Sequence, residues 1–114
     1  MAASFKIQKS SNGKYWFNLV AGNGETILTS QMYEAYASAE KGAESVKTNA
    51  TDSSRFEKKA SENGKPYFVL KAANGQVIGN SQMYSSEASR DSGIAAVMKA
   101  APEAALVDKT ADQA

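Results

Sequence analysis

The stretch FKIQKSSNGKYWFNLVAGNGETILTSQMY, residues 5–33, decides the fold because it occurs twice. It aligns without a gap with FEKKASENGKPYFVLKAANGQVIGNSQMY at residues 56–84. The same offset continues through residues 35–50 and 86–101, and roughly 20 of the 46 pairs that begin at Phe5 are identical. The chain is therefore an internal duplication, so a structure expected for one copy is expected for the other.

Each copy carries two Asn-Gly dipeptides between runs of β-type residues. They are Asn12-Gly13, Asn23-Gly24, Asn63-Gly64 and Asn74-Gly75. Asn-Gly favours a two-residue hairpin with a type I′ turn, in which both central residues have positive φ. We therefore expect three antiparallel strands in each copy, at residues 4–9, 14–21 and 25–29 and at residues 55–60, 65–72 and 76–80.

After the repeated SQMY tetrapeptide the apolar residues recur at helical spacing, which predicts helices at 34–48 and 86–100. Asn49 is expected to end the first helix as a left-handed cap, and Pro102 stands just beyond the second. Gly42 and Gly93 share one mid-helix position, where glycine costs about 1 kcal/mol relative to alanine. This repeated cost indicates a close approach between each helix and the element that it covers.

Strand alternation separates a core face from an open face. The core face is expected to hold Phe5, Phe17, Leu19, Ile27, Phe56, Phe68, Leu70 and Ile78. The open face is expected to hold Trp16, Asn18, Val20, Thr26, Leu28, Tyr67, Val69, Lys71 and Val77. SQMY then joins strand to helix: its serine binds backbone, its methionine (Met32 or Met83) turns inward, and its tyrosine lies on the core edge. The alternative is that SQMY is a duplicated ligand site, in which an accessible tyrosine and glutamine contact a partner.

The string ILTSQMY…AEKGAESVK, followed by VIGNSQMY…SGIAAVMK, resembles the YegP-like family of small bacterial proteins over residues 4–110. The resemblance implies an α+β fold in which two tandem β-β-β-α(-β) repeats form one shared antiparallel sheet. Two helices pack on that sheet, the repeats are related by a pseudo-twofold axis, and the last strands are exchanged, residues 106–109 forming one of them. It implies no activity and no catalytic residues.

These observations predict a single domain, 1–114, made of two repeats. The first repeat covers residues 4–54, and the second, with its C-terminal strand, covers 55–110. Residues 111–114 are expected to form a disordered tail. The resemblance also implies a monomer, in effect a fused dimer, because single-unit members of the family are expected to pair as dimers.

The composition excludes several kinds of chemistry. The chain has no cysteine and no histidine, which removes disulfides, thiolate nucleophiles, Cys/His zinc sites and imidazole-based catalysis. The acidic residues form no recurring pair, and no ligand set or phosphate-binding loop is evident. We therefore predict a non-enzyme without cofactor or metal. The N-terminus has no signal-peptide pattern and no segment is apolar enough to span a membrane, so the cytoplasm is the expected compartment.

The open face is the candidate functional surface, because it combines apolar side chains with no helix to cover them. Its proposed interaction residues are Trp16, Asn18, Val20, Tyr67, Val69 and Lys71. The preferred hypothesis is a non-catalytic module, structural or protein-binding, with an unidentified protein partner. The alternative is weak nucleic-acid binding through Trp16 and Tyr67. The net charge of +1 and the small number of arginines argue against that alternative.

Overall fold

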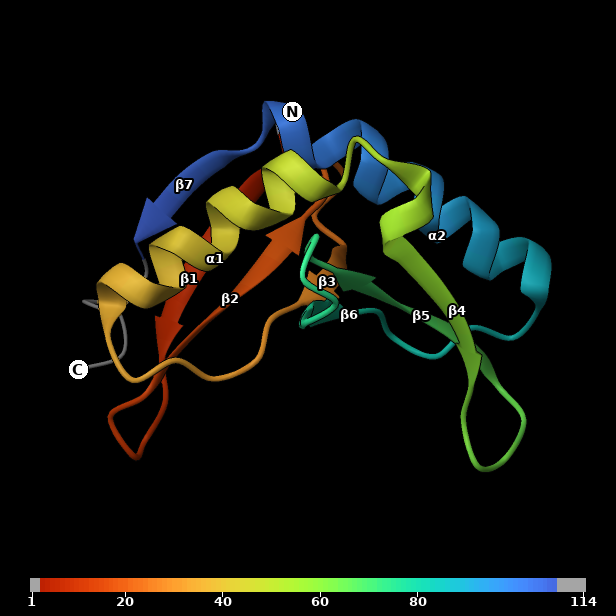
Figure 1. Cartoon of the computed structure of the whole chain (residues 1–114), viewed down its shortest axis with the longest axis horizontal. Coiled ribbons are helices and arrows are strands. Elements are labelled where there is room, and N and C mark those ends of the chain that lie inside the picture. The colour runs from red at the N-terminus through yellow and green to blue at the C-terminus, as the bar shows by residue number, and fades with distance from the viewer. Residues whose placement is uncertain (1–2, 109–114) are drawn as a thin grey trace.

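The computed structural model describes residues 3–108, which form seven strands and two long helices (Figure 1). The predicted tail, 111–114, and the last residue of the expected final strand lie outside these residues. The elements, in chain order, are β1 (Ser4–Lys9), β2 (Tyr15–Val20), β3 (Thr26–Thr29), α1 (Tyr36–Asn49), β4 (Phe56–Ala60), β5 (Pro66–Lys71), β6 (Val77–Asn80), α2 (Glu87–Ala100) and β7 (Ala105–Asp108). Short 3-10 turns, η1 (Ser53–Arg55) and η2 (Ala101–Glu103), follow the two helices.

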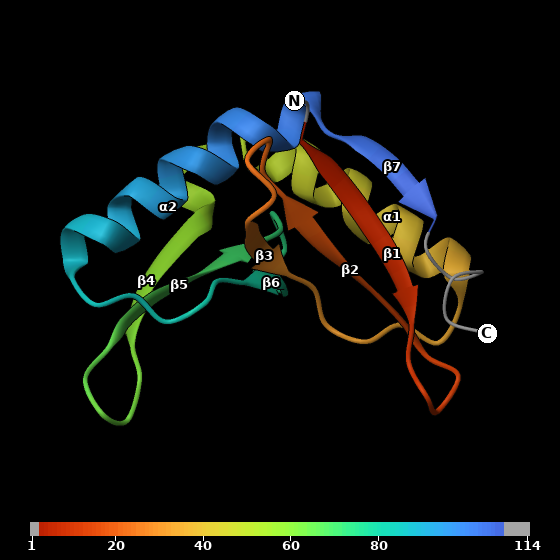
Figure 2. The ribbon, with the colours of Figure 1, turned by 180° about the vertical axis from the view of Figure 1, so that it is seen from behind.

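All seven strands belong to one sheet with the order β4-β5-β6-β3-β2-β1-β7. The two repeats meet where Thr29 of β3 pairs with Asn80 of β6. These residues occupy the same position in their repeats, so the pseudo-twofold axis passes between them. Figures 1 and 2 show the two halves splayed about this junction, with the β1–β2 and β4–β5 hairpins extending away from the helices. The predicted α+β fold with a shared sheet is confirmed.

The last strand is exchanged between the repeats. β7 follows α2 of the second repeat, yet it pairs with β1 of the first. This pairing is parallel, whereas the other strand pairs are antiparallel, so the sheet is mixed and not wholly antiparallel as expected. The reason is that the η2 turn after α2 places Ala105 beside Ser4, the first residue of β1, so both strands leave the same point in the same direction.

The four hairpin loops share one geometry, and it is not the predicted type I′ turn. Glycine has positive φ in each loop, but no other described residue does. In the first loop the Gly13 amide donates to the Ser10 carbonyl and the Ser10 amide donates to Lys14, and the other three loops repeat this pattern. These bonds define a three-residue loop that ends in a left-handed glycine. Asn12 instead uses its side chain to accept from the Lys14 amide.

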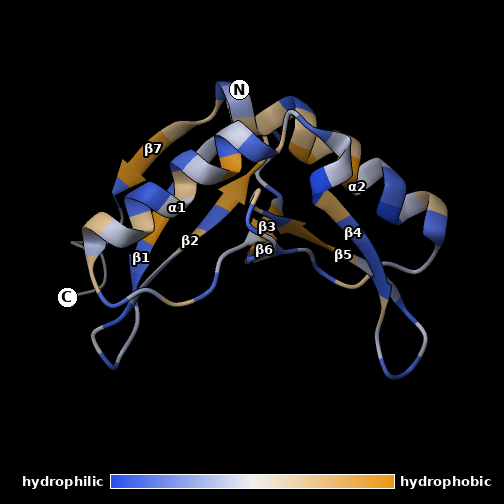
Figure 3. Cartoon of the chain, in the orientation of Figure 1, coloured by the Kyte–Doolittle hydropathy of each residue, from blue (hydrophilic) through white to orange (hydrophobic). Residues whose placement is uncertain are grey.

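The helices cover the sheet face predicted as the core. The phenylalanines and leucines of β1, β2 and β5 are almost fully buried there, and Figure 3 shows hydrophobic residues along these strands and polar hairpin tips. Tyr33 stacks on Phe17 and Tyr84 stacks on Phe68, with ring centroids 6.2 and 6.3 Å apart. The predicted placement of both tyrosines at the core edge is confirmed.

Of the other SQMY predictions, the one for the serine is confirmed and the one for the methionine is wrong. Ser30 accepts the Phe17 amide at 2.9 Å and donates to the Gln31 carbonyl, and the serine of the second copy does the same. Met32 and Met83, however, are 54% and 50% exposed, so the inward methionine was wrong. The tyrosine beside each methionine already fills the space at the core edge.

Two other predictions need correction. Asn49 lies inside α1 in a helical conformation, with its side chain donating to the Ser45 carbonyl, and Ala50 closes the helix without a left-handed residue. Leu28 was expected on the open face but is paired with Leu19 and is 1% exposed. A register shift between β2 and β3 turns it inward.

Leu28 also explains a difference between the repeats. Its counterpart in the second repeat is Gly79, and a Cβ atom on Gly79 would lie 2.9 Å from the Leu28 side chain. The two positions converge near the pseudo-twofold axis, where only one large side chain fits. The two repeats therefore differ at this position: the first has a leucine, and the second has a glycine that leaves room for it.

Candidate functional site

The open face of the sheet brings together the six residues that the sequence predicted. Trp16 lies opposite Gln8 of β1, and Tyr67 lies opposite Lys59 of β4. Directly paired residues of antiparallel strands point to the same face, and these pairs alternate with the buried pairs under the helices. Trp16 and Tyr67 are both intermediate in exposure, so each ring presents part of its surface to solvent.

The centre of this face is polar. Asn18 is paired with Thr29, whose hydroxyl donates to the Asn18 side-chain oxygen at 3.1 Å. Val20 and Val69 share the face but are only 8% and 6% exposed. They add little to an accessible apolar patch, although the sequence indicated that they would. The accessible apolar surface therefore consists mainly of the two aromatic rings and of Val77, which is 40% exposed.

The positions of these rings follow from the strand order. Two strands, β6 and β3, lie between β5 and β2. At about 4.8 Å per strand, β2 and β5 are roughly 14 Å apart across the sheet, and Trp16 and Tyr67 are further apart, because each lies two residues from the line through Asn18 and Val69, in opposite directions. A partner that touches both rings must therefore cross the polar centre between them.

Three lysines on or beside the open face are already paired, whereas Lys6, which lies opposite Asn18 on this face, takes part in no ion pair of the described residues. The Lys71 ammonium lies 2.7 Å from Glu57, and Lys59 lies 3.7 Å from the same carboxylate. The hydrogen bond from Lys71, assisted by the charge of Lys59, holds the pKa of Glu57 below its ordinary value. At the first hairpin, Lys14 pairs with Glu34 at 3.2 Å. These lysines would have to give up a carboxylate before binding a phosphate.

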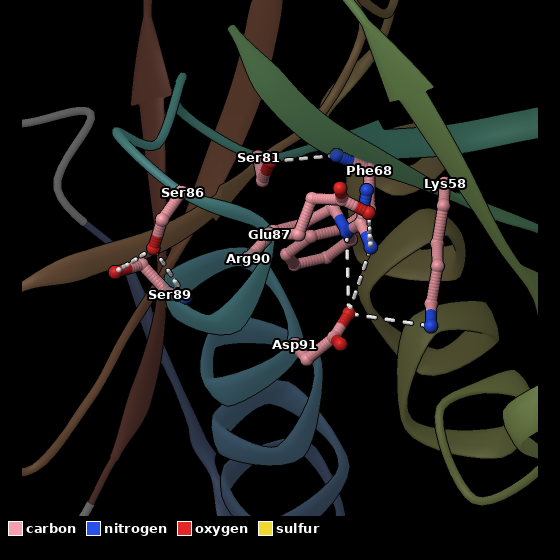
Figure 4. A network of polar contacts seen from close by, with 8 residues as sticks. All are labelled: Lys58, Phe68, Ser81, Ser86, Glu87, Ser89, Arg90 and Asp91. Atoms are coloured by element: carbon pink, nitrogen blue, oxygen red, sulfur yellow. Dashed lines mark hydrogen bonds and ion pairs between the residues drawn. The ribbon is translucent and has the colours of Figure 1, made fainter.

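A second polar cluster connects β4 with α2 (Figure 4). Arg90 is 8% exposed, and its guanidinium contacts Asp91 at 3.1 Å and Glu87 at 3.7 Å. Lys58 reaches Asp91 from β4 at 3.3 Å. Hydrogen bonds from Arg90 and Lys58 hold the pKa of the Asp91 carboxyl below its ordinary value.

Sequence reasoning did not single out this cluster, although the aligned repeats contain a signal for it. The first repeat has Ile7 and Ala39, both fully buried, where the second has Lys58 and Arg90. Two charged residues thus replace two core residues at one end of the second helix. Because all the charges lie beside one another, they form a paired network and not a set of free catalytic groups.

The described residues, 3–108, contain no group of three or more acidic side chains placed to hold a metal ion. No helix in this part of the chain is long and apolar enough to cross a membrane.

The fold and the site define a class: tandem-repeat α+β proteins in which two β-β-β-α units complete a single sheet. The chain belongs to the family described as a domain of unknown function, DUF1508, whose model matches twice, at residues 10–57 and 61–108. The two matches have the same 51-residue offset as the repeats; the first runs from the loop before β2 to the start of β4, and the second from the loop before β5 to the end of β7.

Relatives share the whole arrangement. The chain is 51% identical to the UPF0339 protein YegP of Escherichia coli strain K12 over 96% of this chain and all of the relative. It is 50% identical, with the same coverage, to a UPF0339 protein of Pseudomonas aeruginosa. A solution NMR structure of a UPF0339 protein from Shewanella oneidensis matches with a TM-score of 0.91 at 48% identity, covering 98% of this chain and 95% of that one. The NMR structure of Escherichia coli YegP, described as a protein of unknown function, gives 0.90 at 51% identity, covering 96% and 95%.

Proposed function

We propose that this protein is a monomeric, non-catalytic module of the bacterial cytoplasm that binds another protein through the open face of its sheet. The observation that carries the proposal is the placement of Trp16 and Tyr67. They are equivalent aromatic residues of the two repeats, they lie on the face without helices, and each is partly accessible. Aromatic side chains are enriched at the energetic centres of protein interfaces.

The charges of this face support a protein partner over a nucleic acid. Lys71 and Lys59 share the carboxylate of Glu57, so both would have to give up an ion pair to bind a phosphate, and Lys6 alone does not make a phosphate-binding stripe. The monomeric state is supported by the shared sheet, in which each repeat already supplies the other with strand pairing. Light scattering coupled to gel filtration tests this part of the proposal directly.

Site-specific photo-crosslinking in cells tests the surface. A photo-reactive phenylalanine analogue replaces Tyr67 on the open face in one variant and Lys41, an exposed residue of α1, in the control. We expect a discrete protein adduct from position 67 that is lost when Trp16→Ala is added, and no such adduct from position 41. The same adduct from both positions, or none from position 67, would contradict the proposal.

Weak binding of single-stranded nucleic acid is the second candidate, because both rings of the open face could stack on bases. Trp16 is the only tryptophan, so its fluorescence reports on this face directly. A saturable change on adding short single-stranded or duplex oligonucleotides, weakening steeply as salt is raised, would favour the second candidate. We expect no saturable change.

A further inference from the structure

The two edges of the sheet are finished differently. The edge strand of the first repeat, β1, is covered by β7, which pairs with it in parallel. The equivalent strand of the second repeat, β4, is itself the other edge of the sheet, and no described segment pairs with its outer side. An edge strand leaves backbone amides and carbonyls available for a further strand. The pseudo-twofold axis therefore relates a filled position beside β1 to an open position beside β4.

Each of these positions lies over a groove between an edge strand and a helix. In the first repeat the groove encloses 110 Å³ and is closed by Leu106 of β7. In the second repeat the corresponding groove measures 450 Å³. Its lining residues are Ser53, Phe56, Lys58, Asp91, Ile94, Ala95 and Met98. The larger volume is the space that a leucine-bearing strand would fill.

The open groove is also the more apolar of the two. Where α1 lines the first groove with Ala43, Glu44 and Lys47, α2 lines the second with Ile94, Ala95 and Met98. A phenylalanine lies at the base of each groove. Phe5, in the first groove, is 1% exposed, whereas Phe56, in the second, remains partly exposed. Apolar residues thus replace polar ones on the side that lacks a covering strand.

The register of β7 indicates which sequence would fit. Leu106 lies opposite Phe5, and Asp108, two residues later, lies opposite Ile7. Transferred to β4, the same register places a leucine opposite Phe56 and a carboxylate opposite Lys58. The carboxylate would therefore lie opposite a lysine in the second repeat, whereas Asp108 lies opposite Ile7 in the first.

The charges around that carboxylate position are mixed. Lys58 and Arg90 lie there against Glu87 and Asp91, and Lys58 is the exposed cation that a carboxylate opposite it would meet. The two lysines of β4, Lys58 and Lys59, disfavour a second copy as the occupant, because pairing two β4 edges with Lys58 at the centre would bring lysines of both copies together.

We propose that the β4 edge binds an extended segment of a partner protein, parallel to β4, that carries a large apolar residue followed two positions later by Asp or Glu. The apolar side chain enters the groove between Phe56, Ile94 and Met98, and the carboxylate shares Lys58 with Asp91, which lies 3.3 Å from the lysine ammonium. The backbone of the segment adds an eighth strand to the sheet, the mode of recognition known as β-augmentation. This site lies on the sheet edge beneath α2 and is separate from the open face.

A peptide with the sequence of residues 103–109, acetyl-EAALVDK-amide, serves as the probe, because it carries the leucine and aspartate of β7. It is titrated into the isotopically labelled full chain up to about 5 mM, a concentration that detects binding of about 3 kcal/mol. We expect chemical-shift changes at the backbone amides of Phe56–Ala60 and at the methyl groups of Ile94 and Met98.

Matched peptides and one protein variant make the test specific. Leu106, the template for this leucine, remains 44% exposed, so about half of the roughly 1.5–3 kcal/mol of a fully buried leucine is expected, and replacing it by serine should weaken binding about three- to ten-fold. Replacing the aspartate by lysine should weaken it about two- to five-fold, as for an exposed ion pair. Lys58 is exposed, so the Lys58→Glu variant should still fold. In this variant the peptide with lysine in place of aspartate should bind more tightly than the original peptide.

Three outcomes would overturn the proposal. The first is an absence of shifts at β4. The second is shifts confined to β1 and β7, which would mean that the peptide competes with the native strand. The third is β4 shifts that appear on raising the protein concentration without peptide, which would make a second copy the occupant.

Discussion

The substitution Gly93→Ala should destabilise the protein, although alanine is the better helix former. A Cβ atom at this position would lie 2.7 Å from the Cζ atom of Tyr84, with the hydroxyl closer still, and 3.2 Å from Phe68. Helix propensity favours the alanine by about 1 kcal/mol. Against this, overpacking costs about 1–3 kcal/mol, and displacing Tyr84 from its stack on Phe68 costs about 0.5–1.5 kcal/mol. We expect a net loss of about 2 kcal/mol in the free energy of unfolding.

A double-mutant cycle isolates the cause. In a Tyr84→Ser background the obstructing ring is gone, so Gly93→Ala should there be neutral or stabilise by up to about 1 kcal/mol. Urea unfolding followed by Trp16 fluorescence and by far-ultraviolet circular dichroism measures all four proteins, and coincident transitions justify a two-state treatment. A stabilising Gly93→Ala in the natural chain, or an equal cost in both backgrounds, would refute the reasoning.

The first repeat provides an independent replicate. At Gly42 a Cβ atom would lie 2.7 Å from the Cζ atom of Tyr33 and 3.0 Å from Phe17. Because the phenylalanine is closer here than in the second repeat, Gly42→Ala should cost at least as much as its counterpart. A clearly smaller cost would show that these distances do not determine the effect.

Three further predictions concern other positions. Ser30→Ala should lower the free energy of unfolding by about 1–3 kcal/mol, because it leaves a buried strand amide without its acceptor; the urea midpoint measures this. Gly79→Leu should cost about 1–3 kcal/mol through overpacking against Leu28, and adding Leu28→Gly should recover most of it, whereas additive losses in denaturant melts would contradict the shared space at the axis. The hydrogen bond from Arg90 depresses the pKa of folded Asp91 below the ordinary value of 3.8, so the stability it provides is present above that value and is lost as pH falls through the folded pKa. Asp91→Asn should therefore flatten the fall of stability in acid, and an unchanged pH profile would exclude this contribution.

The sequence alone contained much of the local structure. The duplication, the three strands of each repeat, the two helices and the core face all followed from Asn-Gly spacing and from apolar periods of 2 and 3.6. Such patterns are readable because they depend on residues a few positions apart. The shared glycine of the two helices likewise indicated a close approach, and Tyr33 and Tyr84 are the residues that approach.

The sequence predicted which residues lie on the open face, but not which of them are accessible to solvent. Alternation placed Val20 and Val69 on the open face, but both are almost fully buried in the folded sheet, which a pattern within one strand cannot indicate. The hairpin type could not be read from Asn-Gly alone, since that dipeptide also fits a three-residue loop ending in glycine.

Only the tertiary structure decided the features that join distant parts of the chain. The sequence determined that two similar repeats exist. It did not determine that Leu28 and Gly79 compete for one space at the axis, that β7 runs parallel to β1, or that β4 is left with an open edge and a wide groove. The physical reason is that identical local patterns must meet across a single axis and end at two different edges, where packing and strand pairing treat equivalent residues differently.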